Sequence, residues 1–196
     1  MNNEHHIIIN HKLANAIVCS HAVFNYLTAI QNRITFDQKR DAINGLSAYA
    51  KFLRKVISLV DLSEWTVKEE VELLDEYLQM EKIRFGELFD FSIDNNTPYQ
   101  VLHVLLCIPF VELLVSASLK NNLKPVKLTI SFEYSNNKLL LNVLINRMLP
   151  PFDIQERNDE QQGRFQLLNE KMKLCASEYT ENITQKQTQY TLLINH

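Results

Sequence analysis

The periodicity of the apolar residues first changes close to Gly86, and this change constrains the fold more than any other feature. Before it, apolar residues recur every three or four positions, which is typical of amphipathic helices. After it, short segments alternate between apolar and polar residues, which is typical of half-buried strands. The chain is therefore expected to be α+β, with helices first and a sheet-containing domain second.

Two long helical patterns make up the first part. One covers residues 12–34, with apolar positions Leu13, Ile17, Phe24, Leu27 and Ile30. The other covers residues 38–60, with an apolar stripe of Ile43, Leu46, Ala50, Leu53, Val56 and Ile57. The polar segment "TFDQKRDA" separates them, and Asp37 is expected to cap the second helix. Two helices joined by so short a turn predict an antiparallel hairpin.

The hairpin carries more apolar surface than one pair of helices can bury. We expect Ile17, Phe24 and Leu27 to occupy the core positions of the first helix, which leaves His21 facing outward. A lone hairpin buries only one face, so the apolar stripes predict a homodimer in which two hairpins form a four-helix bundle.

The second part predicts a layered α/β domain. Thr66 and Glu69 form a capping-box pattern at the start of a third helix. "LFDFSID" alternates like a strand, residues 101–119 read as a buried helix, and a β-hairpin turns at Asn136 and Asn137. A helix over residues 164–177 and a strand, "TQYTLLIN", complete the chain. The expected domains are a helical hairpin over residues 1–64 and an α/β sandwich over residues 65–196.

Composition excludes several classes of function. The net charge is −3 and no cluster of lysine or arginine occurs, which argues against nucleic acid as a partner. Residues 101–119 are long enough to span a bilayer, but Glu112 within them argues against a membrane segment. The N-terminal "MNNEHHIIINHKL" lacks the features of a signal peptide and is expected to be a ragged solvated end without a metal site.

Glycine and cysteine narrow the choice further. Gly45, Gly86 and Gly163 are the only glycines, so a glycine-rich loop that cradles phosphates is close to excluded. The cysteines Cys19, Cys107 and Cys175 are widely spaced and lack a metal-ligand pattern. We interpret them as buried reduced thiols of a cytoplasmic protein.

One segment resembles the LytS/YehU-type sensor histidine kinases. "ELLDEYLQMEKIRFGELFDFSID" follows the linker of that family, roughly L-x-x-Y-L-x-I-x-x-x-R-F and then a strand, and its matching core is Tyr77, Leu78, Glu81, Arg84 and Phe85. The resemblance extends in register over most of the chain. It implies a dimerisation and phosphoacceptor hairpin followed by an ATPase-like domain of the GHKL type.

The family's phosphoacceptor box, P-H-F-L-F-N, corresponds to "SHAVFN" in this chain. His21, Phe24 and Asn25 match, whereas Ser20 and Ala22 replace the proline and the first phenylalanine. The resemblance implies that His21 accepts a phosphoryl group and that Asn25 orients the phosphoryl group or an attacking water. A surface histidine without function is the alternative interpretation.

The nucleotide motifs depart from the family pattern. Against Q-P-L-V-E-N-A the chain has "CIPFVELL", so Glu112 is kept and Leu113 replaces the asparagine that ligates magnesium in the family. Against V-x-D-N-G it has "VLINR", in which Ile145 replaces the aspartate that grips adenine, Asn146 matches, and Arg147 replaces the glycine. Gly163 is the one glycine that answers G-x-G-L-x-N, and it is out of register.

These replacements remove the chemistry of ATP binding. Leucine cannot ligate magnesium, which requires oxygen ligands. Isoleucine cannot accept a hydrogen bond from adenine, and an unpaired buried polar group costs about 1–3 kcal/mol. We therefore expect a histidine-kinase fold that binds no ATP and no other cofactor.

Two functions, from different classes of protein, are consistent with these residues. The first is a histidine phosphotransferase, similar to phosphorelay proteins of the ChpT type, which exchanges phosphate between His21 and response-regulator receiver domains. The second is a pseudokinase scaffold that binds a response regulator or a sensor kinase without phosphotransfer. An ATP-dependent autokinase is a distant third.

Overall fold

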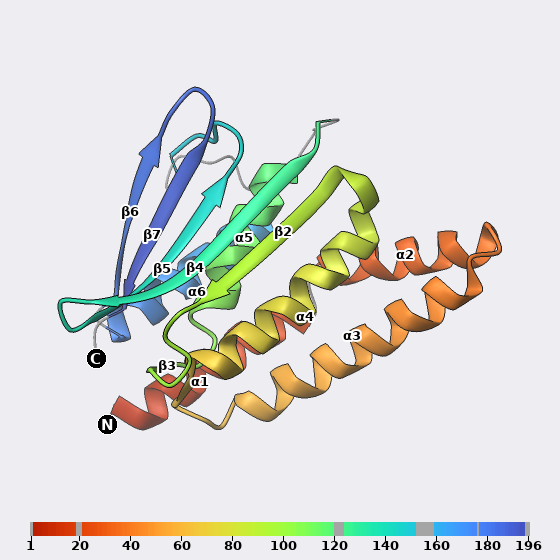
Figure 1. Cartoon of the computed structure of the whole chain (residues 1–196). Coiled ribbons are helices and arrows are strands. Elements are labelled where there is room, and N and C mark those ends of the chain that lie inside the picture. The colour runs from red at the N-terminus through yellow and green to blue at the C-terminus, as the bar shows by residue number, and fades with distance from the viewer. Residues whose placement is uncertain (1, 19–20, 120–123, 152–158, 176, 195–196) are drawn as a thin grey trace.

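The computed structural model of the chain describes residues 2–18, 21–119, 124–151, 159–175 and 177–194 (Figure 1). Its helices are α1 (Asn2–Val18), α2 (His21–Thr35), α3 (Lys39–Leu59), α4 (Val67–Phe85), α5 (Cys107–Leu119) and α6 (Asp159–Leu174). Its strands are β1 (Glu64–Thr66), β2 (Phe89–Asn95), β3 (Val101–His103), β4 (Val126–Ser135), β5 (Lys138–Ile145), β6 (Glu178–Ile183) and β7 (Thr188–Ile194). The predicted α+β class is confirmed.

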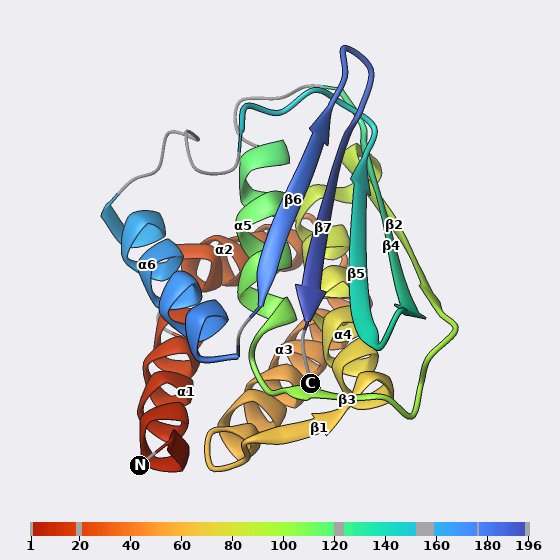
Figure 2. The same cartoon turned by 90° about the vertical axis from the view of Figure 1, so that its left-hand side faces the viewer.

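A five-stranded mixed sheet forms one layer, in the order β2-β4-β5-β7-β6. β2 runs parallel to β4, and the other neighbours are antiparallel. Alternate residues of β4, β5 and β7 are buried on the face that α4 and α5 cover (Figures 1 and 2). β1 and β3 pair separately as a small two-stranded sheet.

The predicted helical hairpin is formed by α2 and α3, which lie side by side (Figure 1). The Tyr26 hydroxyl donates to the carbonyl oxygen of Gly45 at 2.9 Å, deep between the two helices. A Cβ atom at position 45 would lie 3.1 Å from the Tyr26 oxygen, so this close approach favours glycine. α3 packs in turn on α4, where the rings of Phe52 and Tyr77 lie 6.2 Å apart.

The local signals around α4 and the β4–β5 turn are confirmed. The Thr66 hydroxyl accepts from the Glu69 backbone N–H, and the Glu69 carboxylate accepts from the Thr66 N–H, which completes the capping box. Asn136 and Asn137 both have positive φ, at 52° and 59°, as a tight hairpin turn requires.

The expected first helix is wrong in its extent and in its core positions. Two helices stand in place of one over residues 12–34, because α1 packs against α6 whereas α2 packs against α3 and α4. Phe24 and Leu27 are 66% and 40% exposed, and Tyr26 is the buried residue that faces α3. The side chain of Ile17 lies outside the part that the structure describes.

The apolar stripe expected on the second helix is also corrected. α3 buries Ala42, Gly45, Tyr49, Phe52, Val56 and Leu59 within the chain. Of the expected stripe only Val56 is fully buried, while Ile43, Leu46 and Ile57 are exposed by half or more. α3 therefore has two apolar faces. The face with small and aromatic residues packs on the chain's own helices, and the aliphatic face is exposed.

Three further expectations about element bounds are wrong. The N-terminal segment is helical, because Ile9 and Leu13 of α1 are buried. Asp37 does not cap α3 but adopts a left-handed φ of 58° in the connecting turn, a conformation that Asp tolerates well. Residues 101–119 split into β3 and α5, because β3 pairs with β1 and Leu105 then interrupts the helix with a φ of 55°.

The last part of the chain differs in its details. The helix expected over residues 164–177 is α6, Asp159–Leu174. β6 was not predicted, because its exposed polar residues give weak alternation at the edge of the sheet. The final predicted strand is confirmed as β7.

Candidate functional site

His21 is the first residue of α2, in the hairpin that α2 forms with α3. Asn25 follows one turn later and is half-buried, so the two residues share one side of the helix. The side chain of His21 lies outside what the structure describes, and its outward orientation stays a prediction. The helix itself is held firmly, since Arg33 near its end donates to the carbonyl oxygen of Ile83 at the end of α4.

The residues that align with the family's nucleotide motifs lie on α5, at the end of β5 and on α6. Glu112 is buried in α5, where it forms an ion pair with Arg164 of α6. Both side chains are almost completely removed from solvent. The one acidic residue that the chain keeps from the family's nucleotide motif is therefore neutralised by a neighbouring arginine of the chain itself.

Two of the replaced positions belong to the hydrophobic core. Leu113 is 4% exposed in α5, and Ile145 is fully buried at the end of β5. Ile145 lies between Leu128 of β4 and Thr188 of β7 in the sheet register. Neither position offers an oxygen or nitrogen atom of a side chain, so neither can bind a metal ion or hydrogen-bond a base.

Arg147 and Asn146 make contacts within the chain at the adjoining turn. Arg147 donates from Nη1 to the carbonyl oxygen of Ser118 at 2.6 Å and from Nη2 to that of Lys124 at 3.0 Å. Asn146 accepts at Oδ1 from the backbone N–H of Lys127 at 2.8 Å. The guanidinium thus caps the end of α5, where carbonyl groups lack helical partners and carry partial negative charge.

Gly163 lies inside α6 and has a helical backbone. A loop that bends over a nucleotide needs glycine for left-handed or strained backbone conformations. Gly163 belongs to a helix and not to such a loop, and the residue that follows it, Arg164, forms an ion pair with Glu112.

A buried polar cluster extends from Glu112 and Arg164 to α4. Glu81 is 4% exposed and forms an ion pair with Arg84 at 3.3 Å. Burial raises the pKa of Glu81 to about 7, Arg84 opposes this rise, and the charge of Glu112 adds to it. Burial also raises the pKa of Tyr77 well above its ordinary value, with Glu81 and Glu112 adding to the effect. Tyr77 and Glu81 of the linker motif therefore lie close enough to the Glu112–Arg164 pair to interact with it electrostatically.

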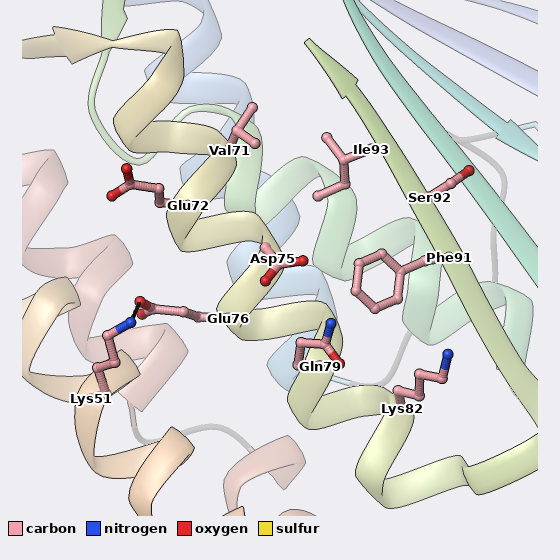
Figure 3. A pocket seen from close by; sticks show the side chains of 10 residues that line it. All are labelled: Lys51, Val71, Glu72, Asp75, Glu76, Gln79, Lys82, Phe91, Ser92 and Ile93. Carbon is pink, nitrogen blue, oxygen red and sulfur yellow. Dashed lines mark ion pairs between the residues drawn. The ribbon is translucent and has the colours of Figure 1, made fainter. Parts of the chain in front are cut away.

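A groove of about 660 Å³ lies elsewhere, between α3, α4 and β2 (Figure 3). Lys51 and Glu76 form an ion pair across it at 2.7 Å, and Asp75 points from α4 toward β2. None of the predicted site residues lines this groove. Its three carboxylates, from Glu72, Asp75 and Glu76, outnumber its two lysines, a balance that disfavours a polyphosphate ligand.

Other candidate chemistry is sparse in the described part of the chain. Cys107 and Cys175 are buried free thiols, and Cys19 lies outside the described residues. Burial raises the pKa of the Cys175 thiol to about 11, so it is unreactive near neutral pH. No three potential metal-ligating side chains come together within the described ranges.

A membrane-spanning helix was not expected from the sequence. Of the helices that the structure describes, none combines the length and apolarity needed to cross a bilayer.

Arg164 is the main residue that the sequence did not identify. It follows Gly163 directly, in the segment that answers the family's last glycine motif. A buried arginine is costly without a carboxylate partner. Its partner lies 52 positions away in the sequence, however, so only the fold could reveal the pair.

Comparisons with known proteins agree with this geometry. The family model described as "Histidine kinase" matches residues 10–89, which include α2, α3, α4 and the first residue of β2. No curated protein matches the chain in sequence.

Solved structures share the fold at low sequence identity. The histidine kinase AdeS of Acinetobacter baumannii has a TM-score of 0.53 and 13% identity, covering 90% of this chain and 98% of its own. A structure described as a bacterial phosphotransferase has a TM-score of 0.59 and 14% identity, covering 93% and 95%. Histidine kinase ThkA, in complex with the response regulator protein TrrA, has a TM-score of 0.51 and 11% identity, covering 90% and 59%. The chain therefore has a histidine-kinase-like fold.

Proposed function

We propose that this chain is a two-component signalling protein that binds no ATP and acts as a histidine phosphotransferase toward response regulators through His21. The proposal is supported by the contacts that the chain itself makes at three positions that align with the family's nucleotide motifs or lie beside them. Arg147 caps α5, Arg164 neutralises Glu112, and Leu113 belongs to the core. The hairpin with His21 and Asn25 is meanwhile retained.

The phosphoryl donor would be an acyl phosphate on a regulator aspartate. A neutral imidazole nitrogen of His21 attacks the phosphorus, so an N–P bond forms and the P–O bond to the aspartate breaks. The aspartate leaves as a carboxylate, and the imidazole loses its proton to solvent. Magnesium would be held by the regulator. The reverse sequence of steps passes the phosphoryl group to a second regulator.

A second copy of the chain would complete the hairpin. The outward face of the hairpin carries exposed Phe24, Leu27, Ile43, Leu46 and Ile57. Phe24 and Leu27 are three residues apart on α2, as are Ile43 and Leu46 on α3, and Ile57 lies eleven residues, about three turns, further along the same side of α3. An apolar groove of about 270 Å³ between α2 and α3 lies on this face. We infer that two hairpins form a four-helix bundle, with residues 1–64 as the dimerisation domain and residues 65–196 as the ATPase-like domain.

The choice of partner is supported by the related structures. ThkA shares this fold and is seen with a response regulator, and the bacterial phosphotransferase shares it over most of both chains. A receiver domain in the cytoplasm is therefore the proposed partner.

The alternative is a pseudokinase scaffold that binds a regulator or a sensor kinase without phosphotransfer. Ser20 and Ala22, which replace the proline and phenylalanine of the phosphoacceptor box, favour it. The experiment is to incubate the chain with labelled phospho-regulators from its own genome, alongside His21→Ala and Asn25→Ala. Phosphotransfer predicts label on the wild type that His21→Ala abolishes. A regulator that binds wild type and His21→Ala equally well without transferring label supports the scaffold.

A further inference from the structure

A buried polar network joins α1 to two distant parts of the chain. Lys171 of α6 donates from Nζ to Oδ1 of Asn10 in α1 at 2.7 Å. Asn10 donates from Nδ2 to the carbonyl oxygen of Leu62, also at 2.7 Å. Asn10 and Lys171 are both fully buried, although they lie 161 positions apart. One amide therefore links α1, α6 and the connection between α3 and β1 (Figure 2).

A fully buried lysine is unusual, since removal of an ammonium group from water is costly. Burial lowers the pKa of Lys171, and the nearby Glu70 opposes this effect. The partner that its Nζ atom contacts is the neutral amide of Asn10. Because buried polar groups are tolerated only when they are paired, α1 must stay docked for Lys171 to keep this partner.

Further contacts fasten α1 at the same place. Ile9 and Leu13 flank Asn10 on the helix and are buried. His11 Nε2 lies 3.3 Å from Asp61 Oδ1, beside the Leu62 carbonyl. The polar network sits in the middle of this apolar contact, where it specifies one register of α1 against α6.

The helix that this network fastens leads directly to the proposed phosphoacceptor. α1 ends at Val18 and α2 begins at His21. The far end of α2 is fixed by Arg33 on the Ile83 carbonyl and its second turn by Tyr26 on the Gly45 carbonyl, whereas its first residue, His21, lies next to the connection from α1. The ATPase-like domain, through α6, thus holds the helix that enters the phosphoacceptor position.

We propose, on the basis of the phosphotransferase function above, that Asn10 and Lys171 are positioning residues for His21. By fastening α1 to α6 they hold the start of α2, and with it the backbone of His21, in one place relative to the ATPase-like domain. In this role the ATPase-like domain needs no nucleotide, because it serves to hold the phosphoacceptor helix in a fixed position.

The test compares Asn10→Leu, Lys171→Met and the double variant in the full-length chain. Asn10→Leu leaves both Lys171 and the Leu62 carbonyl oxygen without their partner, and Lys171→Met leaves the Asn10 oxygen without its donor. The double variant removes the buried ammonium and replaces the Asn10–Lys171 pair by apolar side chains that can pack together. We expect the initial rate of label transfer from a phospho-regulator to fall about tenfold or more in each single variant, because small misplacements of reacting groups cost that much. The double variant should recover most of the rate. Lys173→Met, an exposed lysine on the same helix, is the matched control and should not change it.

The position of α1 is measured in parallel. Nitroxide labels at Glu4→Cys and Glu170→Cys, both exposed, in a Cys19→Ser background report the distance between α1 and α6 by pulsed electron resonance. The distance distribution should be narrow in the wild type and the double variant and broad in the single variants. Regulator binding should stay within about twofold in all of them, since none of the substitutions lies in α2 or α3, the hairpin that carries His21.

Leu13→Asp provides a second test if a single variant does not fold. A charge at this buried position should detach α1 from its apolar contacts and let solvent reach Lys171. It should also slow transfer and broaden the distance. If the wild type transfers label and the displaced variants transfer equally fast, the positioning role is overturned while the phosphotransferase function stands. If the wild type accepts label from no regulator, the phosphotransferase function fails and the positioning role fails with it.

Discussion

Arg147, at the turn after β5, donates to the carbonyl oxygen of Ser118 in the last turn of α5 at a distance of 2.6 Å. A second hydrogen bond reaches the carbonyl oxygen of Lys124. In the family pattern a glycine occupies the position of Arg147 and leaves room for a nucleotide. Here the guanidinium group caps the end of α5 from within the chain, which supports the proposal that the chain binds no nucleotide.

We predict that the chain binds neither Mg-ATP nor Mg-ADP at millimolar concentration. Arg147→Gly should not restore binding, because Leu113 and Ile145 still lack the oxygen atoms that magnesium and adenine require. Isothermal titration calorimetry of the wild type and this variant is the measurement. A saturable heat with a micromolar constant in the wild type would contradict the prediction.

Removal of one partner of the buried pair Glu112–Arg164 should destabilise the fold much more than replacement of both residues by apolar ones. Arg164→Met leaves a buried carboxylate without its cation and should lower the free energy of unfolding by about 3–5 kcal/mol. Glu112→Leu combined with Arg164→Met should recover most of this loss. Urea unfolding of both single variants and the double variant measures the coupling, and strictly additive losses would show that the two residues do not act as a pair.

Stability should fall as the pH rises from about 4.5 to about 7. Burial raises the pKa of both Glu70 and Glu81 from 4.5 to about 7, so the folded chain binds their protons more tightly than the unfolded chain does. The stabilisation from these protons is complete below about pH 4.5 and is lost as the pH passes through about 7.

Glu81→Gln, which cannot ionise, should reduce this pH dependence. Urea unfolding at about pH 5 and about pH 7.5 gives the difference for the wild type and the variant. Glu87→Gln, at an exposed carboxylate, is the control. An unchanged pH difference in Glu81→Gln would contradict the role of this residue.

Features that depend on neighbouring residues could be predicted from the sequence. The capping box at Thr66, the turn at Asn136 and Asn137, and the change of periodicity near Gly86 are each set within a few positions. The helical hairpin was predictable for the same reason, since two amphipathic patterns flank a short turn.

Features that depend on distant partners could not be predicted. α3 is apolar on two faces, and the pattern does not tell which one packs within the chain, so Ile43 and Leu46 were expected where Tyr49 and Phe52 are found. The Glu112–Arg164 and Asn10–Lys171 pairs join residues far apart in sequence. Such pairs leave no periodic trace, because each side contributes a single residue.

The chain should be a homodimer, because the outward face of α3 carries Ile43, Leu46 and Ile57 in exposed positions. Leu46→Asp places a charge at the centre of that face and should give a monomer. Asn44→Asp, on the solvent side of the same helix, is the control and should leave the dimer intact. Light scattering coupled to size-exclusion chromatography at tens of micromolar gives the mass of the wild type and of both variants. A monomeric wild type would contradict the proposed four-helix bundle.

The source of the phosphoryl group on His21 is the most direct test of the whole interpretation. The wild type and His21→Ala are incubated separately with γ-labelled Mg-ATP and with a phosphorylated cognate regulator, and the acid-labile, base-stable label of phosphohistidine is measured on the chain. We predict label on the wild type from the phospho-regulator alone, and none on His21→Ala from either donor. Label from ATP, or label that persists in His21→Ala, would contradict this interpretation.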